Sequence, residues 1–134
     1  MVGVVIVAHG DLARALLETA TLIAGELEGV EGVSFGAEES PGTLYDKVLE
    51  ALNRCGDEAI LLADLPGGSP ANVCARVAME RGCQAVAGVN LPMLIETVLS
   101  RDDEHAIALA QTALQAGQEG LVHLNELLPR PGSG

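Results

Sequence analysis

The chain opens with an unbroken apolar run, and this run restricts the fold more than any other feature. Residues 2–8 read VGVVIVA, are rich in β-branched side chains, and lead directly into His9-Gly10. A strand with one face in water alternates apolar and polar residues, whereas a strand covered on both faces is apolar throughout. The opening of the chain therefore predicts a strand inside a parallel sheet that is covered on both sides.

Strand-like and helix-like segments alternate along the rest of the sequence. Further apolar segments typical of strands occupy residues 30–35, 58–63 and 84–89. Stretches with apolar residues at helical spacing separate them and predict helices near residues 12–24, 41–55, 69–81, 91–101 and 105–116. Such alternation is typical of right-handed βαβ units. The predicted class is α/β, a small mainly parallel sheet of order 2-1-3-4 with helices on both faces. Residues 121–124 are a candidate for a short fifth strand.

The length of the chain indicates its number of domains, and its cysteines and N-terminal run indicate its cellular compartment. The 134 residues fit one domain, predicted at residues 1–128, followed by a mobile tail at 129–134. The three cysteines are odd in number and lack CxxC spacing, which favours free thiols. The opening apolar run lacks a basic flank and is too short for a signal peptide or a membrane span. We therefore predict a cytoplasmic protein that does not insert into the membrane.

Charge and aromatic content exclude some classes of partner. Seven Lys and Arg residues against nineteen Asp and Glu residues give a net charge of −12, which repels nucleic acids and anionic membranes. Phe35 and Tyr45 are the only aromatic residues other than histidine, so the chain lacks the stacking surfaces of single-strand binders. A partner is expected to be basic.

Polar residues follow three of the predicted strands. They are His9, Asp64 and Asn90. In the order 2-1-3-4 the first and third strands are neighbours, so His9 and Asp64 are expected side by side at the carboxyl edge of the sheet, where ligands bind in such folds. A carboxylate there can fix one imidazole nitrogen and leave the other as a nucleophile. A lone histidine after a strand is more often structural, and it is the pairing with Asp64 that favours catalysis.

The segment Gly67-Gly68-Ser69-Pro70 precedes a predicted helix. Two glycines before a helix N-terminus can present backbone N–H groups to an anion, and the Ser69 hydroxyl can either bind that anion or cap the helix. An ordinary glycine turn with a serine cap has the same sequence. The segment lacks the lysine of a nucleotide-binding P-loop. The Cys and His spacings indicate no metal site, and we predict neither metal nor cofactor.

Three segments together resemble one known family. VVIVAHG, LLADLPGGSPANVCAR and GVNLPMLIETVLSRDD are similar to the IIA component of the mannose-type (mannose/fructose/sorbose) phosphoenolpyruvate-dependent sugar phosphotransferase system. The resemblance covers nearly the whole chain. It implies a phosphotransferase component that accepts a phosphoryl group from the phosphocarrier HPr on Nε2 of His9 and passes it to a IIB domain. Asp64 would hold the other ring nitrogen, and Gly67, Gly68 and Ser69 would stabilise the phosphoryl group.

The resemblance also carries expectations about assembly. Members of the family form homodimers in which a C-terminal strand is exchanged and added antiparallel to the sheet, which would be residues 121–124 here. Many members have a fused IIB domain, and we expect the IIB component of this protein on a separate chain. Leu65-Pro66 stands where some members have an aromatic residue, which would alter the surface offered to the donor.

Two other functions stay open at this point. The first is a stand-alone regulatory IIA-like domain without a transport role. If its site were inactive, His9 would be buried or Asp64 would point away from it. The second is a small tetrapyrrole metal chelatase, because those enzymes also open with a strand that ends in His-Gly. A chelatase needs further His or Glu ligands.

Overall fold

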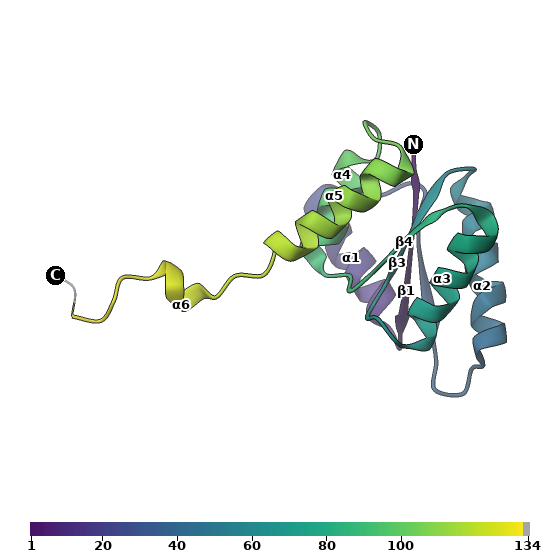
Figure 1. Ribbon diagram of the computed structural model, residues 1–134, viewed down its shortest axis with the longest axis horizontal. Coiled ribbons are helices and arrows are strands. Elements are labelled where there is room, and N and C mark those ends of the chain that lie inside the picture. The colour runs from purple at the N-terminus through teal and green to yellow at the C-terminus, as the bar shows by residue number, and fades with distance from the viewer. Residues whose placement is uncertain (133–134) are drawn as a thin grey trace.

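The computed structural model describes residues 1–132 and has a four-stranded, all-parallel sheet of order β2-β1-β3-β4 (Figure 1). The strands are β1 (Gly3–His9), β2 (Val30–Phe35), β3 (Ala59–Ala63) and β4 (Gln84–Ala87). The helices are α1 (Leu12–Ala24), α2 (Pro41–Cys55), α3 (Ser69–Arg81), α4 (Leu91–Ser100), α5 (Ala106–Glu119) and α6 (Leu124–Leu127). The predicted class and strand order are confirmed.

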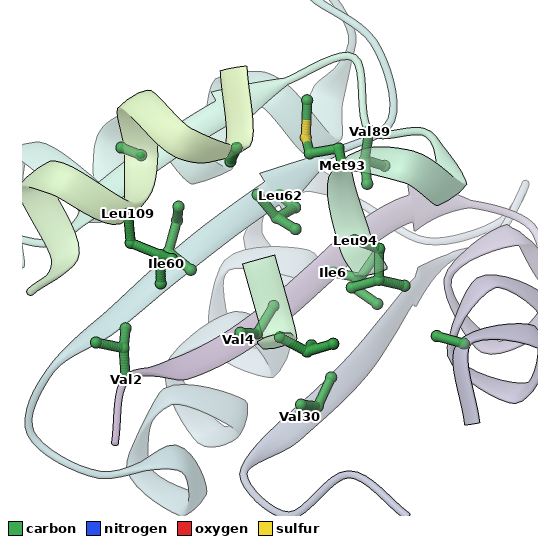
Figure 2. Close-up of a cluster of buried hydrophobic side chains, with 14 of the residues drawn as sticks. Val2, Val4, Ile6, Val30, Ile60, Leu62, Val89, Met93, Leu94 and Leu109 are labelled. Atoms are coloured by element: carbon green, nitrogen blue, oxygen red, sulfur yellow. The ribbon is translucent and has the colours of Figure 1, made fainter. Parts of the chain in front are cut away.

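Helices cover both faces of the sheet, which explains the unbroken apolar run of β1. α2 and α3 lie on one face, and α1, α4 and α5 lie on the other (Figure 1). Val4 and Ile6 point into the core beneath α4 and α5, whereas Val5 and Val7 point into the core beneath α2 and α3. Figure 2 shows the first of these cores, where Leu94 of α4 packs over Ile6. Each residue of β1 from Gly3 to Ala8 is buried.

The fourth strand is shorter than predicted. It ends at Ala87 rather than at residue 89, because Gly88 adopts φ 99° and turns the backbone. The N–H groups of Gly88 and Val89 then both donate to the carbonyl of Ala63 at the end of β3. The strand thus ends level with its neighbour, and the chain turns directly into α4.

The predicted fifth strand is absent from the single chain. Residues 121–123 have no regular structure, and the short helix α6 begins at Leu124. This C-terminal segment extends away from the sheet (Figure 1), and its apolar side chains, including Leu121 and Val122, are exposed. A strand forms only where a neighbour pairs its backbone groups, and here the segment reaches none. Exchange of this strand between subunits stays a prediction.

The cysteines are free, as predicted. Cys55 and Cys74 are buried and Cys83 is half-buried. Burial, with smaller contributions from Cys83 and Asp64, raises the pKa of the Cys74 thiol to about 12, so this group stays protonated. Within residues 1–132, no helix combines the length and the apolar character needed to cross a bilayer.

The mobile tail predicted at 129–134 lies partly outside the described residues. Residues 129–132 are exposed and form no helix or strand, and residues 133 and 134 are not described. The mobility of this tail stays a prediction.

Candidate functional site

The carboxyl ends of β1 and β3 bring His9 and Asp64 together. β1 pairs directly with β3, so the last residue of β1 and the first residue after β3 meet at one edge of the sheet. Nδ1 of His9 lies 2.7 Å from Oδ2 of Asp64, and the same oxygen accepts a hydrogen bond of 2.9 Å from the backbone N–H of His9. The other oxygen, Oδ1, accepts a 2.9 Å bond from the backbone N–H of Leu65. The carboxylate is therefore fixed from both sides.

This bonding sets the chemistry of the two imidazole nitrogens. An ionised carboxylate only accepts hydrogen bonds, so in the neutral ring Nδ1 carries the proton and Nε2 keeps its lone pair. Burial by itself would raise the pKa of Asp64, but the hydrogen bonds from His9 and Leu65 outweigh burial and hold this pKa below its ordinary value. The Asp64 carboxylate thus orients the imidazole, and in the neutral ring Nε2 is the nucleophilic nitrogen.

The pair is open on the histidine side only. The His9 side chain is 50% exposed, whereas the Asp64 side chain is 6% exposed. Gly10, at φ 57°, turns the chain immediately after the histidine, in a backbone conformation that glycine adopts without strain. An inactive site would have His9 buried or Asp64 turned away, and the geometry has neither.

The glycine loop before α3 lies against the imidazole. Gly68 comes so close that a Cβ at this position would stand 3.1 Å from Cε1 and 3.8 Å from Nε2 of His9. Gly67 has φ 89°, which allows the loop to turn toward the end of β1. Gly68 is the N-cap of α3, and Ser69 is the first helical residue, so Ser69 does not take the capping role that was one of its two alternatives. Helix α3 therefore begins beside Nε2 of His9.

Phe35 is a neighbour of His9 that we did not predict. The two residues are paired in the β1–β2 register, and the backbone N–H of Gly10 donates to the Phe35 carbonyl at 3.0 Å. The rings meet edge to face, with centroids 5.7 Å apart and planes at 73°. The strand order makes β2 a neighbour of β1, but the register that pairs Phe35 with His9 is a finding of the structure. The imidazole is thus held between a carboxylate and an aromatic ring.

Asn90, the third polar residue at a strand end, belongs to the scaffold. Its Oδ1 accepts a hydrogen bond from Met93 N–H at 3.0 Å and caps α4. Its Nδ2 donates to the carbonyl of Gly117 in α5, also at 3.0 Å. Both ends of the amide are therefore used to join the two helices.

The structure offers no support for the chelatase alternative. Residues 1–132 contain no group of three or more His, Cys, Asp or Glu side chains placed to hold a metal ion. His105 lies near Glu58, and His123 lies near Glu126, each as an isolated pair. The further ligands that a chelatase needs do not accompany His9 in this part of the chain.

Comparison with known proteins supplies the family. The family model EIIA-man, described as "PTS system fructose IIA component", matches residues 3–114. The chain belongs to this family. The resemblance inferred from the three sequence segments is thereby confirmed, since the matching relatives are named as EIIA and EIIAB components of phosphotransferase systems.

Individual relatives place the chain within the EIIA-man family. The mannose-specific EIIAB component of Escherichia coli K12 is 36% identical over 124 residues, which is 90% of this chain and 38% of that protein. The chain thus spans well under half the length of that relative. The fructose-specific EIIA component of Bacillus subtilis is 36% identical over 105 residues, covering 76% of this chain and 72% of that protein. The crystal structure of an EIIA component from Streptococcus agalactiae superimposes with a TM-score of 0.88 at 33% identity, covering 94% of this chain and 99% of that one.

Proposed function

We propose that this EIIA-man protein is a cytoplasmic phosphoryl carrier that accepts phosphate from phospho-HPr on Nε2 of His9 and passes it to a IIB component. The observation that carries the proposal is the 2.7 Å contact between Nδ1 of His9 and Asp64, which in the neutral ring leaves the lone pair on Nε2 of a half-exposed side chain. A histidine with its second nitrogen fixed in this way is an activated nucleophile. Neither a metal ion nor a nucleotide takes part in the proposed step.

The proposed transfer moves one phosphoryl group between two nucleophiles. The lone pair of Nε2 attacks phosphorus, the Nε2–P bond forms, and the bond between phosphorus and the donor atom breaks with its electron pair returning to the donor. The imidazole gains positive charge as this bond forms, and the Asp64 carboxylate on Nδ1 stabilises that charge. Transfer to the IIB component is the same step in reverse, with a different partner. Positioning and charge stabilisation thus supply most of the catalysis.

The loop before α3 provides the groups that would hold the phosphoryl oxygens. A phosphohistidine adds nearly two negative charges, and the N-terminus of a helix with its free N–H groups favours anions. Gly68 begins α3 directly beside the imidazole, and its missing side chain leaves room next to Nε2. We assign Gly67, Gly68 and the hydroxyl of Ser69 to this role.

Charge and surface character support a basic carrier as the donor. The net charge of the chain is −12, which favours fast association with a positively charged face. Leu12 and Leu65, each within three positions of a site residue in the sequence, are 43% and 47% exposed and provide apolar contact area. This combination suits a transient complex with HPr around His9.

We also propose a homodimer in which the C-terminal segment of each subunit pairs with the other. β4 is at the edge of the sheet, and residues 121–124 carry exposed apolar side chains without a partner strand in the single chain. An open edge and an unpaired apolar segment are complementary. The segment would add to β4 of the second subunit in antiparallel orientation.

Phosphotransfer can be tested with purified components. Incubation with phosphoenolpyruvate, enzyme I and HPr is expected to place an acid-labile, base-stable phosphate on the protein. His9→Ala should abolish the label, whereas His105→Ala, at an exposed histidine paired with Glu58, should retain it. Absence of label, or label retained in His9→Ala, would overturn the proposal. Loss of the label on adding a IIB component distinguishes a transport carrier from a regulatory domain, which would keep it.

A further inference from the structure

The single lysine of the chain holds the end of β2. Lys47 lies in α2 and is half-buried, with its side chain 35% exposed. Its Nζ donates to the carbonyl of Ser34 at 2.6 Å and to the two carboxylate oxygens of Glu39 at 3.0 and 2.8 Å. All three N–H donors of the ammonium group thus have an oxygen acceptor. Every one of these acceptors belongs to the end of β2 or to the loop that follows it.

Glu39 extends this contact to the other side of Phe35. Its Oε1 accepts a 3.0 Å hydrogen bond from the backbone N–H of Gly36. The hydrogen bonds from Lys47 and from Gly36 lower the pKa of the Glu39 carboxyl, so it remains ionised at neutral pH. Ser34 and Gly36 flank Phe35 in the sequence, and both are therefore anchored through Lys47 and Glu39.

Phe35 transmits this anchoring to the histidine. It is the last residue of β2, its carbonyl accepts from Gly10 N–H, and its ring meets the His9 imidazole edge to face. β2 is an edge strand, paired only with β1. The end of an edge strand opens readily unless something ties it down. Without Lys47, the carbonyl of Ser34 next to Phe35 would lose its hydrogen bond, and Glu39 would lose its cation.

A second ion pair in the same two elements provides a comparison. Nε of Arg54, in the last turn of α2, donates to Oε1 of Glu31 in β2 at 2.8 Å. This pair also ties α2 to β2, but it lies toward the start of β2 and not at the end that contacts His9. Removal of either cation takes one helix-to-strand contact from the fold. Only removal of Lys47 takes a contact from the end of β2 next to Phe35.

We propose that Lys47 is a positioning residue for His9. Together with Glu39 it fixes the strand end that presents Phe35 to the imidazole, and so keeps the ring in the orientation that directs Nδ1 to Asp64 and leaves Nε2 open. Lys47 itself touches neither the imidazole nor a phosphoryl group. The kinetic consequence rests on the proposed phosphotransfer, whereas the effect on the orientation of the ring does not.

The test compares Lys47→Met with Arg54→Met. Each variant replaces a cation by an unbranched apolar side chain in α2. Thermal unfolding and the amide NMR spectrum establish that both are folded. In ¹⁵N spectra of the imidazole rings, Lys47→Met should change the His9 nitrogen shifts toward a mixture of the two tautomers, and Arg54→Met should keep the wild-type shifts. Lys47→Arg, which can still donate to Glu39, should restore most of the wild-type spectrum.

Transfer kinetics give the second readout. In single-turnover reactions at saturating phospho-HPr, Lys47→Met should lower the rate constant roughly 5–20-fold, the size expected for a misplaced reacting group. The concentration of donor that gives half the maximal rate should stay within about twofold. An effect on that concentration alone would indicate a docking role and overturn the proposal.

Other outcomes are equally decisive. Wild-type His9 shifts in folded Lys47→Met would overturn the positioning role. If Lys47→Met does not fold, Glu39→Gln removes the charge from the same contact, and the same imidazole spectra then decide. If no variant and no wild-type protein accepts phosphate, the proposed function fails, while the comparison of imidazole spectra still tests the role of Lys47.

Discussion

The carboxylate of Asp64 accepts three hydrogen bonds where β1 and β3 end. These bonds fix both the backbone and the ring of His9. Two of the donors are backbone N–H groups, from His9 and Leu65, and the third is Nδ1 of the imidazole. The same side chain therefore orders the turn and selects the tautomer. Changes at this residue should affect the protonation chemistry and the acid stability together.

Acid stability is the first prediction at this scale. The pKa of Asp64 is lower in the folded protein than its ordinary value, so the folded state favours the carboxylate. The resulting stabilisation is complete above the unfolded-state pKa of about 3.9 and is lost as the pH falls below it and through the folded-state pKa. In urea titrations, the free energy of unfolding of the wild type should therefore exceed that of Asp64→Asn above about pH 4, and this difference should shrink as the pH falls below about 4. If the difference in free energy of unfolding between the two proteins stayed constant down to pH 3, the lowered pKa of Asp64 would be contradicted.

Gly68 gives a second prediction at the residue scale. Its φ of −98° suits any L-residue, but a Cβ would lie 3.1 Å from Cε1 of His9. Gly68→Ala should thus fold, with a thermal unfolding midpoint near that of the wild type. It should transfer phosphate at least about tenfold more slowly, because the methyl group displaces the imidazole or crowds Nε2. Gly42→Ala is the control, since a Cβ there has its nearest neighbour at 3.7 Å. Unchanged transfer in Gly68→Ala would show that the loop does not limit the site.

At the scale of elements, most boundaries follow from residues that act locally. Ser40 caps α2 by accepting from Thr43 N–H, and the apolar runs of β1 and β3 are buried on both faces. The adjacency of His9 and Asp64 could also be predicted, because it depends only on strand order. The same reasoning predicts that β2 lies beside β1, but not the register that brings Phe35 to His9. The anchoring by Lys47 could not be predicted, because it depends on the path of the loop between β2 and α2.

Substitutions of Asn90 can show whether this residue joins two helices or takes part in phosphotransfer. Asn90→Ala removes the cap of α4 and the bond to Gly117 of α5, and should lower the free energy of unfolding by about 1–3 kcal/mol. Asn90→Asp keeps an acceptor for Met93 N–H and should recover part of that loss. Phosphotransfer by both folded variants should match the wild type below their melting temperatures. A selective loss of transfer would place Asn90 in the site.

At the scale of the whole molecule, fold and charge were readable from the sequence, and the end of the chain was not. The parallel sheet follows from the βαβ pattern, which involves only segments of one chain, and its order is the common 2-1-3-4 order. The structure of residues 121–124 depends on what pairs with them, and residues 1–132 of the single chain provide no neighbouring strand. The net charge of −12 acts over the whole surface and bears on association rather than on the fold.

Salt dependence of the complex tests this view of the charge. Between 50 and 500 mM NaCl, the affinity for HPr should fall by about tenfold or more, mainly through slower association, because added salt screens exposed charges. Binding can be followed by titration with unphosphorylated HPr at each salt concentration. The melting temperature of the protein alone, measured in the same buffers, provides the control for effects on folding. An affinity that does not change with salt would contradict electrostatic docking.

The position of the phosphate on the imidazole tests the central claim most directly. Protein labelled with ¹⁵N and phosphorylated by enzyme I and HPr can be studied by NMR, where coupling between phosphorus and nitrogen identifies the bonded atom. The geometry predicts one phosphoryl group per chain, on Nε2 of His9, with Nδ1 still protonated and bonded to Asp64. Phosphate on Nδ1, or on any residue other than His9, would contradict the account.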